Sequence, residues 1–388
     1  VSYVFAVSTM MGSFTLLGIF NYGVREAARS SGDRRRLTAL FWELMLSRMV
    51  LGIVGSLVYL IVSVRSDQWL IFALFYAYFL ANVLDVTWLF VGVEEIRPVV
   101  FKNIAAKSLA VLAIFLFVKN QEDAPIYVAI LAVSTLLTNV SMYPQLRNRI
   151  GRSAGVHWTQ LWVHVHGSLR LFMPQIAVVL YLQIGRVLLQ HYTGDSRQVA
   201  FYDQAEKIVM IPLLLVTSLS SVMMPRMASE FESGNRRGME RHLELSGTIS
   251  LLLAVPMFIG LSLIASDFVP WYLGPEFGPT ILAVIVLSPL VVSNSLGGVA
   301  GSQFLTATNQ VHIMTVAHGF AAIINVLCNV VLIPRLGAVG CAVSAVVASS
   351  AAAAIQVFAV RGQMSIRGLT LSGLRYLAFT VPVALTVL

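Results

Sequence analysis

Long apolar runs alternate with short polar segments along the whole chain. Each run has roughly 18 or more residues and few charges, the length that an α-helix needs to cross about 30 Å of hydrocarbon. The pattern predicts an all-α polytopic membrane protein with about twelve membrane helices. The predicted spans are residues 1–22, 38–64, 69–92, 99–118, 125–146, 160–185, 199–224, 243–266, 279–302, 311–333, 336–360 and 372 onward.

Composition supports this class and excludes others. Hydrophobic residues make up 57% of the 388 residues and charged residues only 11%, which excludes an ordinary soluble domain. The net charge of +8 is explained by basic loops on one side of a membrane, so we expect no nucleic-acid partner. Cys328 and Cys341 stand singly in apolar runs, where small buried thiols are expected rather than a disulfide or a metal site.

Lysine and arginine concentrate in every second loop. Loops on one side of the predicted membrane hold 18 of the 26 basic residues, and loops on the other side hold 5. Short loops rich in these residues stay in the cytoplasm, so the loop after residues 1–22 is assigned there. The other three basic residues, Arg48, Arg170 and Lys207, lie inside predicted helices.

A short motif recurs after the first and the seventh span, as SGDRR at residues 31–35 and SGNRR at residues 233–237. The even spacing predicts two six-helix bundles that run in the same direction, related by a pseudo-two-fold axis along the membrane normal. One helix is then expected before Val1, and the chain is expected to be truncated at both ends. The predicted organisation is an N-terminal bundle at 1–146, a cytoplasmic connection at 147–158, a C-terminal bundle at 159–360 and the start of a further helix at 361–388.

Ionisable residues inside membrane helices are expensive and mark functional sites. Arg48 and Arg170 each lie about ten residues from the cytoplasmic end of a span, roughly 15 Å into the membrane. Two cations at matching depth suit an anionic substrate, and the alternative is local neutralisation, for instance by Glu43 or Asp85. Asp85 is also deep enough to serve as a coupling site or as a structural partner.

A charged cluster stands at the outer end of the span 199–224. Asp203 and Lys207 are one helical turn apart and are expected to pair. With Glu206 they form either a solvated cluster, the ordinary explanation, or an outer gate. Pro212 in this span frees a backbone carbonyl and predicts a bend, as Pro174 does beside Arg170.

No catalytic motif is present in the sequence, and every external loop is short, so we expect a transporter rather than an enzyme. His157, His164 and His166 are too scattered for a metal site. Polar contacts to neighbouring helices are the favoured explanation for each histidine. We expect no cofactor.

Five stretches resemble the signatures of one transporter family. They are residues 17–28 (LGIFNYGVREAA), 84–96 (LDVTWLFVGVEEI), 172–181 (FMPQIAVVLY), 202–219 (YDQAEKIVMIPLLLVTSL) and 222–226 (VMMPR). They are similar to the Wzx-type polysaccharide flippases, which export O-antigen and capsule repeat units and belong to the multidrug/oligosaccharidyl-lipid/polysaccharide exporter superfamily. Where many members place lysine after an aspartate, this chain has Gly185 and Arg186, which puts a salt bridge there in doubt.

The resemblance implies two six-helix bundles around a central cavity that opens to one side at a time. It implies a flippase of the bacterial plasma membrane that moves undecaprenyl-pyrophosphate-linked oligosaccharide from the inner to the outer leaflet, driven by protons or sodium. Arg48 and Arg170 are then expected to contact phosphate or sugar, and Asp85 to act as counter-charge or ion site. Membrane lipids, a polysaccharide polymerase and glycosyltransferases are the expected partners.

Three other functions stay open. A drug or cation antiporter of the same superfamily would be expected to carry acidic rather than basic cavity residues, and Arg48 and Arg170 argue against it. A lipid II flippase shares the cationic cavity, and the YDQAEKI block at residues 202–208 favours the polysaccharide branch. A non-transporting scaffold of a polysaccharide assembly complex would keep its membrane charges paired and dry.

Overall fold

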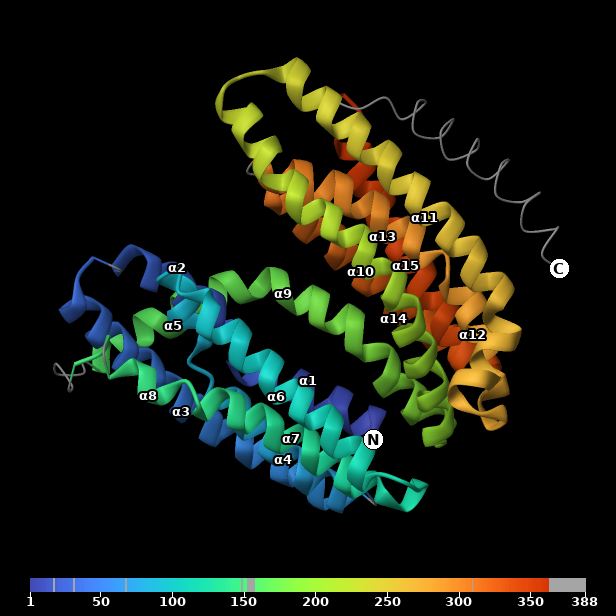
Figure 1. Cartoon of the computed structure of the whole chain (residues 1–388), viewed down its shortest axis with the longest axis horizontal. Coiled ribbons are helices and arrows are strands. Elements are labelled where there is room, and N and C mark those ends of the chain that lie inside the picture. Colours follow the sequence, from blue (N-terminus) through green and yellow to red (C-terminus); the bar gives the residue numbers. More distant parts are fainter. Residues whose placement is uncertain are drawn as a thin grey trace. The chain divides into compact units, whose positions relative to one another are not determined.

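The computed structural model describes residues 1–16, 18–30, 32–66, 68–147, 149–151, 158–308 and 310–362, and these residues form helices and short connections (Figure 1). The α-helices are α1 Ser2–Leu16, α2 Ile19–Ser30, α3 Arg34–Val64, α4 Trp69–Val83, α5 Thr87–Gly92, α6 Ile96–Phe117, α7 Ala124–Val140, α8 Tyr143–Leu146, α9 Trp158–Thr193, α10 Ser196–Glu232, α11 Arg236–Leu273, α12 Gly278–Leu287, α13 Leu290–Gly297, α14 Val311–Leu336 and α15 Ala338–Ala359. Two 3₁₀ turns, η1 Gln121–Asp123 and η2 Pro275–Phe277, and a π-helical segment, η3 Gly298–Leu305, complete them.

The chain divides into two compact units, Val1–Val179 and Leu180–Leu388. The border falls inside α9, so this helix contributes to both units. The connection predicted from the sequence spans 147–158, of which 152–157 lie outside the described residues, and that boundary stays a prediction.

The fold class predicted from the sequence, an all-helical membrane protein of two bundles, is confirmed. Within the described residues, eight helical spans are long and apolar enough to cross a membrane. Each predicted span up to residue 360 coincides with one or more helices, and the span from 372 lies outside the described residues. Among these spans, four are broken: 1–22 between α1 and α2, 69–92 between α4 and α5, 125–146 between α7 and α8, and 279–302 between α12 and α13.

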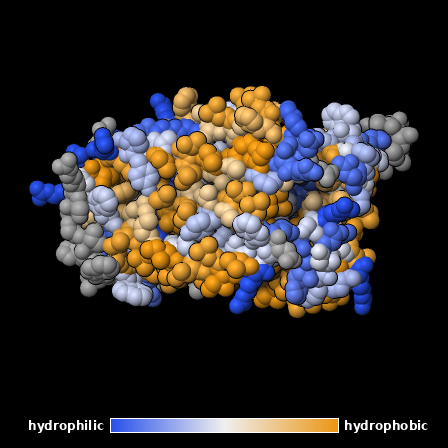
Figure 2. All heavy atoms as spheres, turned by 90° about the horizontal axis from the view of Figure 1, so that it is seen from below, coloured by the Kyte–Doolittle hydropathy of each residue, from blue (hydrophilic) through white to orange (hydrophobic). Residues whose placement is uncertain are grey.

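Apolar side chains cover the outside of these helices, as a lipid environment requires. Of the α6 residues, Val99 and Ala110 are buried, whereas Phe101 is 75% exposed and Phe115 is 71% exposed. Figure 2 shows hydrophobic side chains over much of the visible face. A helix that is apolar on its exposed side is explained by contact with lipid rather than water.

Each unit has its own core. In the first unit, Trp88 is buried and stacks on Phe41, with ring centroids 6.2 Å apart. In the second unit, α14 and α15 pack through small residues, among them Ala321 and Ala348. Small side chains let membrane helices approach closely, and this close approach gives the packing energy that hydrophobic burial cannot supply in lipid.

The repeated motif begins a helix in both units. Asp33 is the N-cap of α3, and its carboxylate accepts from the Arg35 N–H at 2.8 Å. Asn235 is the N-cap of α11, and its Oδ1 accepts from the Gly238 N–H at 3.1 Å. The sequence pattern assigned the arginines of both motifs to loops. In the structure they lie in the first turn of a helix. The common capping role supports an internal repeat.

Candidate functional site

The span 69–92 contains a break where the last carbonyls of α4 lose their partners. α4 ends at Val83 and α5 begins at Thr87. In lipid such groups must be satisfied by protein. Asn139 Nδ2 donates to Ala81 O at 2.6 Å, Arg48 Nη2 to Asn82 O, Arg48 Nε to Val83 O at 3.0 Å, and Tyr143 Oη to Leu84 O at 2.9 Å. Side chains of α3, α7 and α8 thus hold four successive carbonyls.

Arg48 is therefore placed at the C-terminal end of a helix, where a cation is favoured by the helix dipole. The side chain is 1% exposed. Within the described residues its Nη1 makes no hydrogen bond, and this nitrogen is buried. The role of Arg48 as a substrate contact stays a prediction.

Asp85 lies in the break itself. Its Oδ1 accepts from the Thr87 N–H at 2.8 Å and from the Thr87 hydroxyl at 2.6 Å, which begins α5. The carboxylate also interacts electrostatically with Arg48 and Tyr143. This geometry fits the predicted counter-charge, and a coupling role for Asp85 stays a prediction.

A cavity of about 1050 Å³ in the first unit lies beside the break. Leu84 and Tyr143 line it, together with apolar side chains of α3. Arg34 and Arg147 also line it, and both are exposed. Apolar walls with two guanidinium groups suit a ligand that has a hydrocarbon part and an anionic part. These two cations differ from the pair that the sequence suggested.

Glu43 meets a partner that the sequence analysis did not assign to it. Its Oε2 lies 2.9 Å from His164 Nε2, and His164 Nδ1 lies 3.0 Å from the Tyr22 hydroxyl. The three side chains come from α3, α9 and α2, and each is less than 9% exposed. Glu43 was expected to neutralise Arg48, but its hydrogen bond is to His164. The expectation that His164 contacts neighbouring helices is confirmed, but its pairing with an acid required the fold.

Close packing fixes α9 against α2 near this site. A Cβ atom on Gly167 would lie 2.4 Å from Cε2 of Tyr22. We therefore expect Gly167→Val to lower the free energy of unfolding by about 1 to 3 kcal/mol, because overpacking forces the helices apart. Denaturation in mixed micelles measures this change. Gly319→Val is the control, since nothing lies within 4 Å of a Cβ there. Equal stability of the two variants would contradict the close contact.

The second unit holds a buried charge cluster around Arg186. Its Nε donates to Asp203 Oδ1 at 3.0 Å, its Nη2 donates to Glu206 Oε2, and its Nη1 donates to Gln183 Oε1 at 3.1 Å. The guanidinium also lies 5.8 Å from the centre of the Tyr202 ring. One arginine of α9 therefore joins two carboxylates of α10, and the doubt about an ion pair at Arg186 is resolved by this contact.

The predicted pair of Asp203 and Lys207 is confirmed, with Nζ 2.8 Å from Oδ2. A fully solvated cluster is wrong, because Asp203 is 5% exposed and Glu206 is 8% exposed. Arg186 lowers the free-energy cost of burying these two carboxylates by neutralising their charge. The Lys207 side chain remains 57% exposed. A gate role for the three residues stays a prediction.

A second cavity, of about 200 Å³, lies within the second unit. Its lining is rich in uncharged polar groups: Thr217, Ser293, Asn294, Ser302, His318, Ser349 and Gln356. Gly298 and Ser302 of η3 line it, and π-helical turns occur at functional sites. The sequence did not single out these residues, because hydroxyl and amide side chains carry no spacing code.

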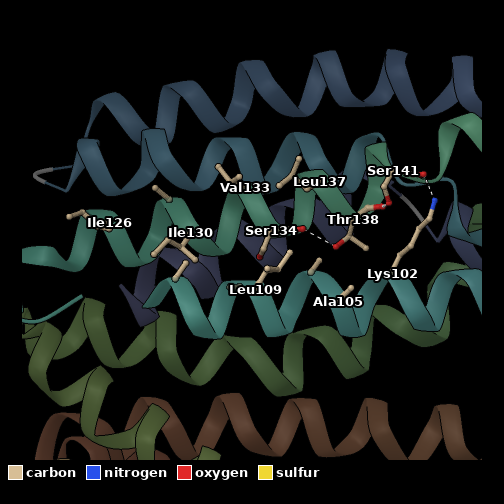
Figure 3. Close-up of a pocket in the computed structure, with 14 residues that line it drawn as sticks. Lys102, Ala105, Leu109, Ile126, Ile130, Val133, Ser134, Leu137, Thr138 and Ser141 are labelled. Carbon is tan, nitrogen blue, oxygen red and sulfur yellow. Dashed lines mark hydrogen bonds between the residues drawn. The ribbon is translucent and has the colours of Figure 1, made fainter. Parts of the chain in front are cut away.

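An apolar groove of about 580 Å³ runs between α6 and α7 (Figure 3). Its polar groups are engaged locally: Thr138 Oγ1 donates to Ser134 O at 2.8 Å, and Lys102 Nζ donates to Ser141 O. Aliphatic side chains such as Ala105, Leu109 and Ile130 form the rest of the wall. The groove therefore presents hydrocarbon and suits an apolar chain.

Several residues singled out in the sequence are not placed by these contacts. Arg170 and Pro174 fall within α9, but their side chains lie outside the described residues, as does the whole of His157. Pro212 lies within α10, which runs as one helix over Ser196–Glu232. The predicted bends at both prolines stay predictions.

Comparisons with known proteins agree on the kind of protein. Residues 1–231 match the family model described as polysaccharide biosynthesis protein. The chain is 23% identical over 322 residues to a putative O-antigen transporter of Escherichia coli K12. This match covers 79% of this chain and 75% of that protein. It is 26% identical over 161 residues to a probable low-salt glycan biosynthesis flippase, Agl15, of Haloferax volcanii. That match spans 42% of this chain and only 33% of the archaeal protein.

The fold has a solved counterpart. A multidrug resistance transporter of the MATE family, in an inward-facing conformation and assigned to the MOP superfamily, superposes with a TM-score of 0.73. The match covers 95% of this chain and 92% of that chain at 14% identity. At this identity the likeness establishes the fold and says nothing of the substrate.

Proposed function

The chain belongs to the polysaccharide biosynthesis protein family, and on that premise we propose that it is a flippase for lipid-linked oligosaccharide. The substrate class we propose is an undecaprenyl-pyrophosphate-linked repeat unit, carried from the inner to the outer leaflet of a bacterial plasma membrane. The named relatives, a putative O-antigen transporter and a probable glycan flippase, support this class.

The polar cavity of the second unit is the observation that carries this proposal. Hydroxyl, amide and imidazole groups line a hollow among helices that are otherwise apolar. Such groups can replace water around a sugar, which lowers the free energy of moving it through hydrocarbon.

In this proposal, arginine side chains bind the pyrophosphate group of the substrate. Arg170 is assigned as a phosphate contact, and Arg48 as a second one, which requires the surrounding helices to part because its unbonded Nη1 is buried. The exposed Arg34 and Arg147 of the larger cavity fit an anionic head before it enters. Guanidinium groups bind phosphate oxygens in bidentate geometry, so the charge is not left unpaired in a medium of low dielectric constant.

The test uses cells that make a surface polysaccharide through this protein. We expect Arg170→Ala to reduce surface polymer to background, because a buried phosphate would lose its cation, while lipid-linked repeat units accumulate inside. Arg170→Lys keeps the charge and should retain part of the activity. Immunoblotting of membranes controls for the amount of protein.

Other outcomes would point elsewhere. Normal surface polymer in Arg170→Ala would remove the site assignment. Loss of the protein without accumulation of lipid-linked repeat units would favour a scaffold, drug sensitivity would favour an antiporter, and arrested peptidoglycan synthesis would favour a lipid II flippase.

A further inference from the structure

Tyr22, His164 and Glu43 form a continuous hydrogen-bonded chain in the first unit. The Tyr22 hydroxyl and the Glu43 carboxylate occupy the two ring nitrogens of His164, at 3.0 and 2.9 Å. The exposed fractions of Tyr22, His164 and Glu43 are 6%, 8% and 6%. With both ring nitrogens bound to protein, His164 is shielded from competing water.

The hydrogen-bonded triad of Tyr22, His164 and Glu43 can bind one proton without rearrangement. When Glu43 is a carboxylate and His164 is neutral, the pair carries one negative charge. One added proton, held by His164 or by Glu43, brings the net charge of the pair to zero. Sodium is a poor alternative, because it would need several oxygen ligands and the histidine supplies nitrogen.

Among the side chains that the structure describes, no lysine or arginine forms an ion pair with Glu43, whose ion-pair partner is His164. On α2, Arg25 lies over the Tyr22 ring at 5.3 Å, but it is paired with Glu26, which also binds Arg29. On α3, Arg48 is engaged with the carbonyls of α4. On α9, His166 is exposed, and the side chain of Arg170 lies outside the described residues.

The position of the pair gives its protonation a mechanical consequence. α2 and α3 belong to the first unit, whereas α9 crosses the border between the two units. The same helix carries His164 onto Glu43 and, further along, Arg186 onto α10. Any change in the contact between His164 and Glu43 therefore acts on the helix that both units share.

We propose that the pair of His164 and Glu43, completed by Tyr22, is the proton site that drives transport. The inference rests on the proposed function and adds the coupling ion and its residues. Proton binding holds α9 against α2 and α3, and release into water loosens that contact. A transport cycle that alternates between the two states moves one proton for each lipid carried.

The test is made with the full chain in liposomes that contain undecaprenyl-pyrophosphate-linked oligosaccharide. Periodate, which does not cross the membrane, oxidises the sugars in the outer leaflet and so reports the distribution. For the unchanged protein, a difference of one pH unit across the membrane should shift the ratio of lipid-linked oligosaccharide in the outer leaflet to that in the inner leaflet by up to about tenfold. In Glu43→Gln, which keeps a hydrogen-bonding group but binds no proton, the ratio should stay near one.

Three variants complete the design. His164→Gln should behave as Glu43→Gln does, and Glu43→Asp should keep part of the pH response. His166→Gln, two residues further along α9 and exposed, should keep the full response. Cooperative denaturation in mixed micelles, at the transition of the unchanged protein, shows that each variant is folded.

The outcomes separate the two proposals. If the unchanged protein equilibrates no lipid, the proposed function fails. If it equilibrates lipid but responds to a sodium gradient instead of a pH gradient, the proton site is wrong and the flippase stands. A full pH response in folded Glu43→Gln also overturns the proton site.

Discussion

Replacing Arg186 with methionine is expected to lower the free energy of unfolding by about 3 to 5 kcal/mol, the usual effect of removing one partner from a buried ion pair. Asp203 and Glu206 would then both lose the arginine that binds them. Only the exposed Lys207 would remain, paired with Asp203. The methionine fills much of the space, so lost packing contributes little. We expect the variant to be found in membranes in reduced amount.

The chain offers a matched control in the same cluster. Lys207 also pairs with Asp203, but its side chain is 57% exposed whereas that of Arg186 is 12% exposed. Lys207→Met should therefore change the free energy of unfolding by less than about 1 kcal/mol. Denaturation in mixed micelles measures both variants under one condition.

Neutralising the acids tests the cause. In the triple variant Arg186→Met, Asp203→Asn, Glu206→Gln, no buried charge remains, and most of the lost stability should return. If the triple variant is as unstable as Arg186→Met alone, the hydrogen bonds of the arginine matter and its charge does not. Equal losses for Arg186→Met and Lys207→Met would refute the importance of burial.

The helical spans were predictable from the sequence because the membrane imposes one length on all of them. The breaks were not. Gly18, with φ of 71°, separates α1 from α2, but a glycine in an apolar run is not by itself a signal. The depth of Asp85 in its span predicts a coupling site or a structural partner, yet the sequence could not show that its carboxylate begins a new helix.

The sites divide in the same way. Asp203 and Lys207 are one turn apart on a single helix, so their pairing followed from local geometry. His164 and Glu43 are 121 residues apart in sequence, and only the packing of α9 on α3 brings them together. Residues of unremarkable type, such as the serines of the polar cavity, gain meaning only from a shared hollow.

Arg48→Met is expected to destabilise the protein by about 1 to 3 kcal/mol, because Val83 O would lose the donor that Arg48 supplies, while Asn82 O would keep only backbone donors such as the Asp85 N–H. A carbonyl buried without a partner costs about 1 to 3 kcal/mol. Asp85 would also lose its nearby cation. Arg48→Lys keeps the charge, but one ammonium group cannot reproduce the planar fork that reaches both carbonyls.

Tyr143→Phe provides the graded comparison, since it removes only the bond to Leu84 O and should cost about 1 kcal/mol. The two roles of Arg48 are separated by measuring stability in mixed micelles and lipid equilibration in liposomes on the same samples. If Arg48→Met equilibrates lipid at the normal rate while it unfolds more easily, Arg48 only holds the end of α4. If its stability stays within about 0.5 kcal/mol of the unchanged protein and transport is lost, the guanidinium acts on the substrate, and its bonds to α4 contribute nothing measurable.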